Sequence, residues 1–234
     1  MRARVVIVML AASCGRVDFD SVRAAATDGA VPSPGFVGAV ADQCNLQMTT
    51  CSVDLQEAGD VGDLVLVTIS YDPAAQQVAS VRDDSPSGGS YTRVLGPIAW
   101  AVSSTHTEVW SGTSTVAAAL TVTVTYVQAP ASLSEVWADE YTFTAIDTTS
   151  FATGSGGTVV SSGARATSRD GELIWGHGLA GMDDELHTGP GFTTLLFDYG
   201  DTLEDQLAAT AGTYEARFAN PSSGEWVAML LALY

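Results

Sequence analysis

The octapeptide SEVWADEY carries three carboxylates, on Glu135, Asp139 and Glu140. Glycoside hydrolysis uses two carboxyl groups about 5–9.5 Å apart. In a strand, Glu135 and Asp139 point to one face, but their Cα atoms lie ~13 Å apart and Trp137 stands between them. This spacing disfavours a catalytic pair. Glu140 points to the other face, and we expect a half-buried structural carboxylate that accepts hydrogen bonds from an arginine or from the backbone.

Serine hydrolase chemistry needs a base aimed at the serine, and the chain has three histidines. No G-x-S-x-G elbow occurs. His106, beside a turn in SSTHTEVW, is expected to be an exposed strand residue. His177 alternates with Leu173, Trp175 and Leu179, a pattern typical of a core histidine. Neither histidine is predicted to be catalytic.

The segment HGLAGMDDELH holds residue types that ligate zinc, namely His177, Asp183, Asp184 and His187. It lacks the HExxH spacing that places two histidines on one helical face, and glycines interrupt it. We therefore expect an acidic surface loop between strands rather than a zinc site.

Hard oxygen ligands suited to calcium occur in two further places. They are Asp83 and Asp84 at a turn, and Asp198, Asp201, Glu204 and Asp205 in FDYGDTLED. No D-x-D-x-D-G loop is present, so solvated turns are the preferred interpretation. No cofactor is predicted, and calcium is retained as the alternative.

Aromatic side chains could instead stack on sugar rings. The chain has five tryptophans and seven tyrosines. Trp175 and Trp226 lie in apolar segments and are expected in the core. Trp110 and Trp137 alternate with polar or acidic neighbours, so these two are the candidate ligand-binding residues. Core packing is still the default for large aromatics in a sandwich.

The elements that position these residues are predicted to be strands. Residues 119–127, ALTVTVTYV, alternate apolar and threonine side chains, as in a half-buried antiparallel strand. Residues 64–71 and 226–234 are apolar on both faces and indicate covered strands. Thr202–Ala209 suggests a helical turn, and a helix could also be drawn through residues 226–234, although the aromatic ends of that run suit a central strand. The pattern predicts an all-β, antiparallel, two-sheet sandwich of about eight to ten strands.

The N-terminus has the features of a secretory signal. Arg2 and Arg4 precede an apolar run from Val5 to Ala12, which is too short for the ~20 residues that span a bilayer. Small residues then predict cleavage after Ser13.

The chain has three cysteines, an odd number. Cys44 and Cys51 are close enough in sequence to pair in an oxidising compartment, which leaves Cys14 over. Leu10 to Cys14, LAASC, resembles the lipobox of bacterial lipoproteins. The resemblance implies that Cys14 becomes the first residue of the mature chain and carries lipid on its sulfur and amine.

Charge restricts the partners. The formal net charge is −18, and all nine basic residues are arginine. Nucleic acids and anionic membranes both require basic patches, so the sequence argues against them as partners. A solubilising surface is the preferred interpretation of this charge.

A second resemblance covers about residues 58–234. The order GDLVLVTISYD, VASVRDDSPSGGSYTRVL, TEVWSGTSTVAAALTVTVTY and EVWADEYTF is similar to a recurring bacterial extracellular β-sandwich domain. It continues through RDGELIWGHGLA, AGTYEARF and SGEWVAMLLAL. Such modules occur on secreted, surface and phage structural proteins. The resemblance implies a jelly-roll-like fold and no particular activity.

Together these features predict a signal peptide (1–13), a flexible tether (14–35) and a single β-sandwich domain (36–234). The predicted function is that of a non-enzymatic, lipid-anchored surface protein in adhesion or envelope structure, with a glycan or protein as ligand. The alternatives are a glycan-binding module assisted by calcium and a jelly-roll carbohydrate-active enzyme. The expected location is the cell envelope, on the outer membrane or cell surface, or the exterior if no anchor is added.

Overall fold

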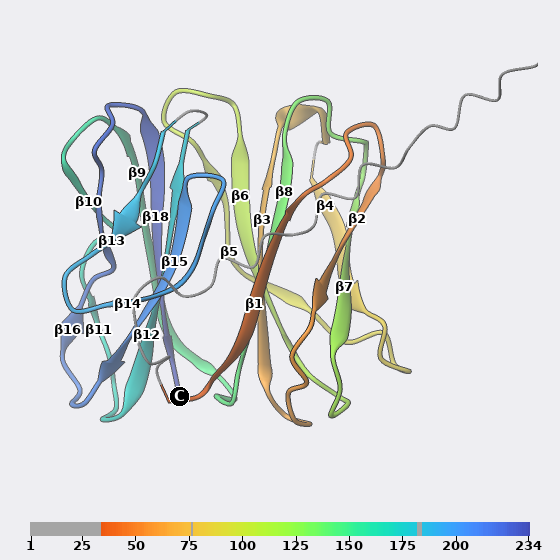
Figure 1. Ribbon diagram of the computed structural model, residues 1–234, viewed down its shortest axis with the longest axis horizontal. Coiled ribbons are helices and arrows are strands. Elements are labelled where there is room, and N and C mark those ends of the chain that lie inside the picture. Colours follow the sequence, from red (N-terminus) through yellow and green to blue (C-terminus); the bar gives the residue numbers. More distant parts are fainter. Residues whose placement is uncertain (1–33, 76, 182–183) are drawn as a thin grey trace, which may run out of the picture.

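The computed structural model describes residues 34–75, 77–181 and 184–234 (Figure 1). The predicted signal peptide, nearly all of the predicted tether and the lipidation candidate Cys14 lie outside these residues, as does Asp183. Predictions about them therefore stay predictions.

Two sheets form the first unit, residues 36–141. Its larger sheet has the order β1-β8-β3-β6-β5 and its smaller sheet has the order β2-β7-β4. The strands are β1 Phe36–Gln43, β2 Thr50–Leu55, β3 Leu64–Tyr71, β4 Val78–Asp83, β5 Thr92–Ala99, β6 His106–Thr113, β7 Leu120–Tyr126 and β8 Ser134–Tyr141. A short 3-10 turn, η1, spans Pro73–Ala75. All strand pairs in this unit are antiparallel.

The second unit, residues 146–234, has a larger sheet of order β9-β18-β12-β15-β14, a smaller sheet of order β10-β17-β13 and the pair β11-β16. The strands are β9 Ile146–Ser155, β10 Val159–Ser161, β11 Arg165–Ala166, β12 Glu172–Ala180, β13 His187–Thr188, β14 Thr193–Asp198, β15 Asp201–Ala208, β16 Thr213–Tyr214, β17 Arg217–Ala219 and β18 Glu225–Leu233. These pairs are antiparallel as well.

The two units share one strand order. With β11 and β16 set aside as an additional pair, the strands of the second unit match β1 to β8 one by one in chain order. In each larger sheet the first strand pairs with the last, the last with the third, the third with the sixth and the sixth with the fifth. In each smaller sheet the second, seventh and fourth strands are neighbours. The same jelly-roll-like sandwich is therefore present twice.

The two sandwiches pack face to face. Figure 1 shows the smaller sheets on the outside and the two larger sheets in the middle. One core lies within each unit, around Val67 and Val122 in the first and around Phe218 and Leu230 in the second. A third core joins the two larger sheets and contains Leu66, Trp137, Trp175 and Leu231 among others.

This layering explains the strand patterns. In β7 buried apolar side chains alternate with half-buried threonines, because β7 belongs to an outer sheet with one covered face. In β3 and β8 every residue is buried, because the larger sheet of the first unit is covered on both faces. Both the polar and the apolar residues of β8 are consequently part of a core.

The antiparallel β-sandwich is confirmed, but it has more parts than expected. The described residues form eighteen strands in five sheets, not eight to ten strands in two. Several strands have only two or three residues, too short for a periodic signal. The helical turn expected over Thr202–Ala209 is wrong, because this segment is strand β15, whose pairing with β12 and β14 overrides local helix preference.

The predicted disulfide between Cys44 and Cys51 is present, with a Cα–Cα distance of 5.5 Å. Cys44 directly follows β1 in the larger sheet of the first unit, and Cys51 lies in β2 of the smaller sheet. The bond therefore joins the two sheets at the entry to the sandwich.

Candidate functional site

The carboxylates predicted to be an unsuitable catalytic pair lie in the core between the units. Glu135 is 6% exposed and accepts a hydrogen bond from Trp137 Nε1 at 2.8 Å. Asp139 is fully buried and accepts one from Trp175 Nε1, in the opposite unit, at 2.8 Å. Both carboxylates are thus held by indole donors inside a packed interface, where no substrate has access.

Burial favours the protonated form of these acids. Desolvation raises the pKa of Asp139 to about 8, although the hydrogen bond from Trp175 opposes the shift. Desolvation also raises the pKa of Glu135 to about 7. The Glu135 carboxyl is hydrogen-bonded to that of Asp201 in the second unit, whose pKa is also raised by desolvation and by the charge of Glu135. Buried carboxyl groups therefore link the two units while they carry protons.

Glu140 differs from its predicted role. It is 1% exposed rather than half-buried, and neither carboxylate oxygen has a hydrogen-bond partner in the described part of the chain. Desolvation, together with the charges of Asp63 and Asp60, raises its pKa to about 7. The prediction of an arginine or backbone donor for Glu140 is wrong. Protonation removes the charge of the carboxylate and so lowers the free-energy cost of its burial.

His177 is buried in the core, as predicted. Its ring lies 4.7 Å from that of Trp137 and 5.6 Å from that of Trp175, and its Nδ1 is 3.2 Å from Thr68 Oγ1. Desolvation lowers its pKa to about 3, so the imidazole is neutral. His106 is half-buried at the start of β6 and stacks on Tyr71, rather than being exposed as expected.

The candidate metal ligands do not converge. His187 is exposed, pairs with Glu185 at 3.4 Å and stacks on Phe197. Asp201 accepts a hydrogen bond from the Ala180 amide, whereas Glu204 accepts one from the Gly189 amide. Within residues 34–75, 77–181 and 184–234, no three histidine, cysteine, aspartate or glutamate side chains are placed to hold a metal ion.

The turn acids proposed for calcium have structural partners as well. Asp83 accepts hydrogen bonds from Ser85 and from the Tyr91 hydroxyl, the latter at 3.1 Å. Asp84 accepts one from the Thr121 amide at 3.0 Å. These contacts hold the turn after β4 against the neighbouring strands.

Trp137 is wrong as a ligand-binding candidate. It is 1% exposed and lies at the centre of the core between the units. Its acidic neighbours suggested an outward position, but the second unit covers them too. Trp110 is half-buried on β6 and lines a hollow at the surface. Of the two candidates, only Trp110 can touch a ligand.

Trp110 lines a hollow of about 300 Å³ in the first unit. The hollow lies between β4 of the smaller sheet and the edge of the larger sheet, where β5 pairs with β6 and leaves β4 without a neighbour on that side. Its other polar walls come from Ser80, Arg82, Ser90 and Tyr91. A volume of this size suits a small ligand or one unit of a polymer.

The Trp110 ring is held in place from below. Its Nε1 donates to Glu108 Oε2 at 2.9 Å, and the buried Glu108 also accepts a hydrogen bond from the Tyr71 hydroxyl at 2.6 Å. Arg93 completes this arrangement with an ion pair to Glu108 at 3.3 Å. The indole is therefore a fixed surface rather than a mobile side chain, which lowers the entropy cost of stacking.

Arg82 supplies the hollow with an available donor group. It is exposed on β4, and no carboxylate of the described residues lies within ion-pair distance of its guanidinium. Only five arginines lie in the described residues, and two of them, Arg82 and Arg93, flank Trp110. A planar guanidinium with five N–H donors is suited to oxygen-rich ligands.

At the matching place in the second unit, side chains of the described residues bridge the gap between the two sheets. There β15 corresponds to β6. The buried side chain of Glu204 in β15 accepts a hydrogen bond at 2.9 Å from the amide of Gly189, just after β13. Thr188 and Thr194 are hydrogen-bonded across the same gap between β13 and β14. The same topology is thus closed in one unit and open in the other.

We found no family model that matches the chain, and no curated protein or solved structure with significant similarity to it. Fold and site together define the described part of the chain as a duplicated, jelly-roll-like β-sandwich with a hollow beside Trp110. Among the described residues, no helix is both long and apolar enough to cross a membrane.

Sequence reasoning found Trp110 but missed its neighbours Arg82, Ser90 and Tyr91. The scarcity of basic residues was the available signal, because each of the nine arginines stands out in so acidic a chain without lysine. The turn SGGSY carries Ser90 and Tyr91 to the hollow, but its glycines and serines by themselves indicate only a turn.

Proposed function

We propose that this protein is a non-enzymatic, lipid-anchored surface protein that binds glycans through the hollow beside Trp110. The observation that carries the proposal is the contrast between the units. The gap closed by β13 in the second unit is open in the first, and it is lined by a fixed indole and by a guanidinium that has no ion-pair partner among the described residues.

The chemistry of the hollow suits a sugar. The flat apolar face of an indole packs against the C–H face of a pyranose ring, while its edge stays hydrogen-bonded to protein. Arg82, Ser80 and Ser90 offer hydrogen-bonding groups to sugar hydroxyls around that face. The carboxylates and histidine considered for catalysis in β8 and β12 lie in cores away from this surface, which supports binding without turnover.

Substitution of Trp110 should abolish glycan binding. On a glycan array, with and without EDTA, the wild-type protein is expected to retain a defined set of sugars. Trp110→Ala should weaken binding to that set at least about tenfold, the equivalent of ~1.4 kcal/mol. Arg82→Gln changes an exposed side chain outside the core and should also weaken glycan binding.

Trp226→Ala is the matched control, because Trp226 is a half-buried tryptophan of the second unit whose Nε1 donates to Gly156. It should leave glycan binding unchanged. An array with no retained sugar, or equal losses in the Trp110 and Trp226 variants, would contradict the proposal. Loss of binding in EDTA alone would assign calcium a part in it.

The anchor is tested separately at Cys14. Cys14→Ser should move the protein from the membrane fraction to the medium or soluble fraction, because each buried acyl CH₂ contributes ~0.8 kcal/mol to membrane attachment. Mass spectrometry of the N-terminal peptide of the wild type should show a lipid-modified Cys14. A free thiol there, or unchanged membrane association of the variant, would refute the anchor and leave the glycan site untouched.

A further inference from the structure

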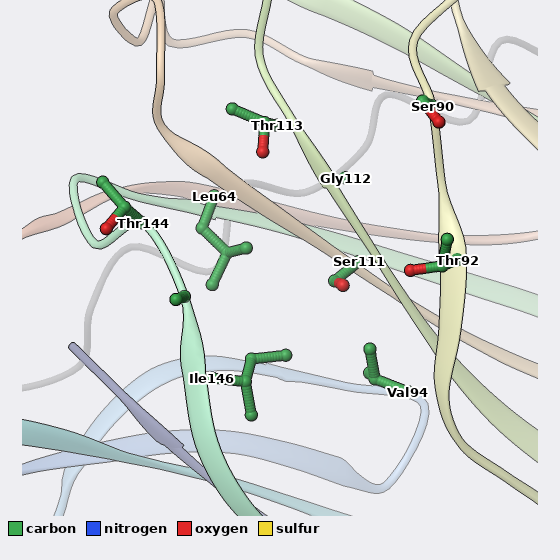
Figure 2. A pocket seen from close by; sticks show the side chains of 10 residues that line it. Leu64, Ser90, Thr92, Val94, Ser111, Gly112, Thr113, Thr144 and Ile146 are labelled. Carbon is green, nitrogen blue, oxygen red and sulfur yellow. The ribbon is translucent and has the colours of Figure 1, made fainter.

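A second hollow lies on the opposite face of the same strand pair. It has a volume of about 310 Å³ and is lined by β3, β5, β6 and the segment 144–146 that leads into β9. In Figure 2, Leu64, Thr144 and Ile146 lie on one side, Thr92 and Val94 on the other, and Ser111 between them. It is therefore found at the seam between the two units.

The lining of this second hollow is neutral. It contains hydroxyl groups and aliphatic side chains but no charged or aromatic residue. The hydroxyls of Thr92, Ser111 and Thr113 have no hydrogen bond to any other described residue. A ligand with many hydroxyls and weakly apolar ring faces would satisfy these groups, whereas a charged ligand would find no partner.

Ser90 lines both hollows. It lies two residues before β5, at the edge of the larger sheet, where Tyr91 and Trp110 line one hollow and Thr92 and Ser111 line the other. Gly88 and Gly89 come just before it with φ of 71° and 58°, and a Cβ on Gly89 would meet Asp83 and Tyr91. At Ser90 the edge between the hollows therefore carries a small side chain, which two glycines precede.

From this arrangement we infer that the two hollows are subsites of one track, which binds a linear, neutral glycan whose chain crosses the sheet edge at Ser90. The inference rests on the proposed function and adds the ligand class to it. One sugar stacks on Trp110 beside Arg82, and a later sugar of the same chain occupies the hydroxyl-lined hollow. The net charge of −18 repels polyanionic chains, which favours a neutral polymer.

The test is the dependence of affinity on chain length. With cello-oligosaccharides of two to six sugar residues as probes in isothermal titration calorimetry, the affinity of the wild type is expected to rise at least about tenfold from the shortest to the longest, because the second contact is intramolecular. Ser111→Met fills the second hollow and should remove this gain while leaving the disaccharide affinity unchanged. Thr92→Met, an exposed substitution on β5, should act in the same way.

Ser52→Met is the matched control, since Ser52 is an exposed strand residue on β2, in the outer sheet. It should keep the full gain with chain length. A gain that survives both Ser111→Met and Thr92→Met, equal affinity for all chain lengths, or no binding of this neutral series would overturn the inference. If Trp110-dependent binding of another sugar persists in those cases, the proposed function stands alone. If no sugar binds in a Trp110-dependent manner, both the inference and the proposed function are contradicted.

Discussion

Raising the pH from 5 to 9 is expected to lower the free energy of unfolding by ~4 kcal/mol or more. The cause is the set of buried acids whose folded-state pKa is raised: Asp139 and Glu204 to about 8, and Glu135 and Glu140 to about 7. Desolvation is the main cause in each. The folded state holds these protons at pH values where the unfolded chain has released them, so stability falls as the pH rises through the folded pKa values.

His177 acts in the opposite direction at lower pH. Its folded pKa of about 3 lies below the ordinary value of 6.5, so protonation of the unfolded chain lowers stability progressively below that pH. Between about pH 4.5 and 6.5 the four carboxyl groups outweigh one imidazole. We therefore expect maximum stability at about pH 4 to 4.5, measured by urea denaturation at pH 4, 5, 7 and 9.

The Asp139→Asn variant tests how much the ionisation of Asp139 contributes to the loss of stability at high pH. The amide oxygen can still accept the hydrogen bond from Trp175, and the variant cannot ionise. It should match the wild type at pH 5 and exceed its stability by ~1–3 kcal/mol at pH 9. Asp54→Asn, at an exposed position of β2, is the control and should leave the pH profile unchanged. A wild-type optimum at pH 8 or above would contradict this explanation of the buried acids.

Trp137→Ala is expected to cost about 3–5 kcal/mol and to destabilise both units together. Trp137 is 1% exposed, contacts the His177 ring from the opposite unit and donates to buried Glu135. Its removal leaves a cavity in the core that the units share and deprives Glu135 of its indole donor.

Amide hydrogen exchange distinguishes a loss of stability in both units from a loss confined to one unit. In Trp137→Ala, protection should fall in β7 of the first unit and in β18 of the second by similar free energies. Trp226→Ala, at a half-buried position, should cost less and act mainly in the second unit. A change under about 1 kcal/mol, or a loss confined to β7, would show that the units do not depend on their common core.

The sequence predicted the antiparallel sandwich because local alternation is sufficient for that inference. In β7, threonines on one face and aliphatic residues on the other identify an outer strand without knowledge of its neighbours. The duplication could not be predicted in this way. It is a matter of which strands pair, and the short strands β10, β13 and β17 that complete the second smaller sheet have two or three residues each.

Trp110 and Trp137 illustrate the limit for the site. Both alternate with polar residues, so their local patterns are equivalent. Their environments differ because Trp137 faces the second unit, whereas Trp110 faces the gap beside β4. The hollow joins β4, β5 and β6 through long-range pairing, and neither hydrophobic periodicity nor residue spacing contains that information.

The central claim, that the hollow beside Trp110 is the ligand site, is tested most directly by the indole N–H signals in a ¹⁵N–¹H NMR spectrum. The chain has five tryptophans, Trp100, Trp110, Trp137, Trp175 and Trp226, and each gives one such signal. On titration with cello-oligosaccharides, or with the sugar that the array retains, the Trp110 signal should shift to saturation while those of the buried Trp137 and Trp175 stay in place. A saturable shift of other indoles with Trp110 unmoved would contradict the account.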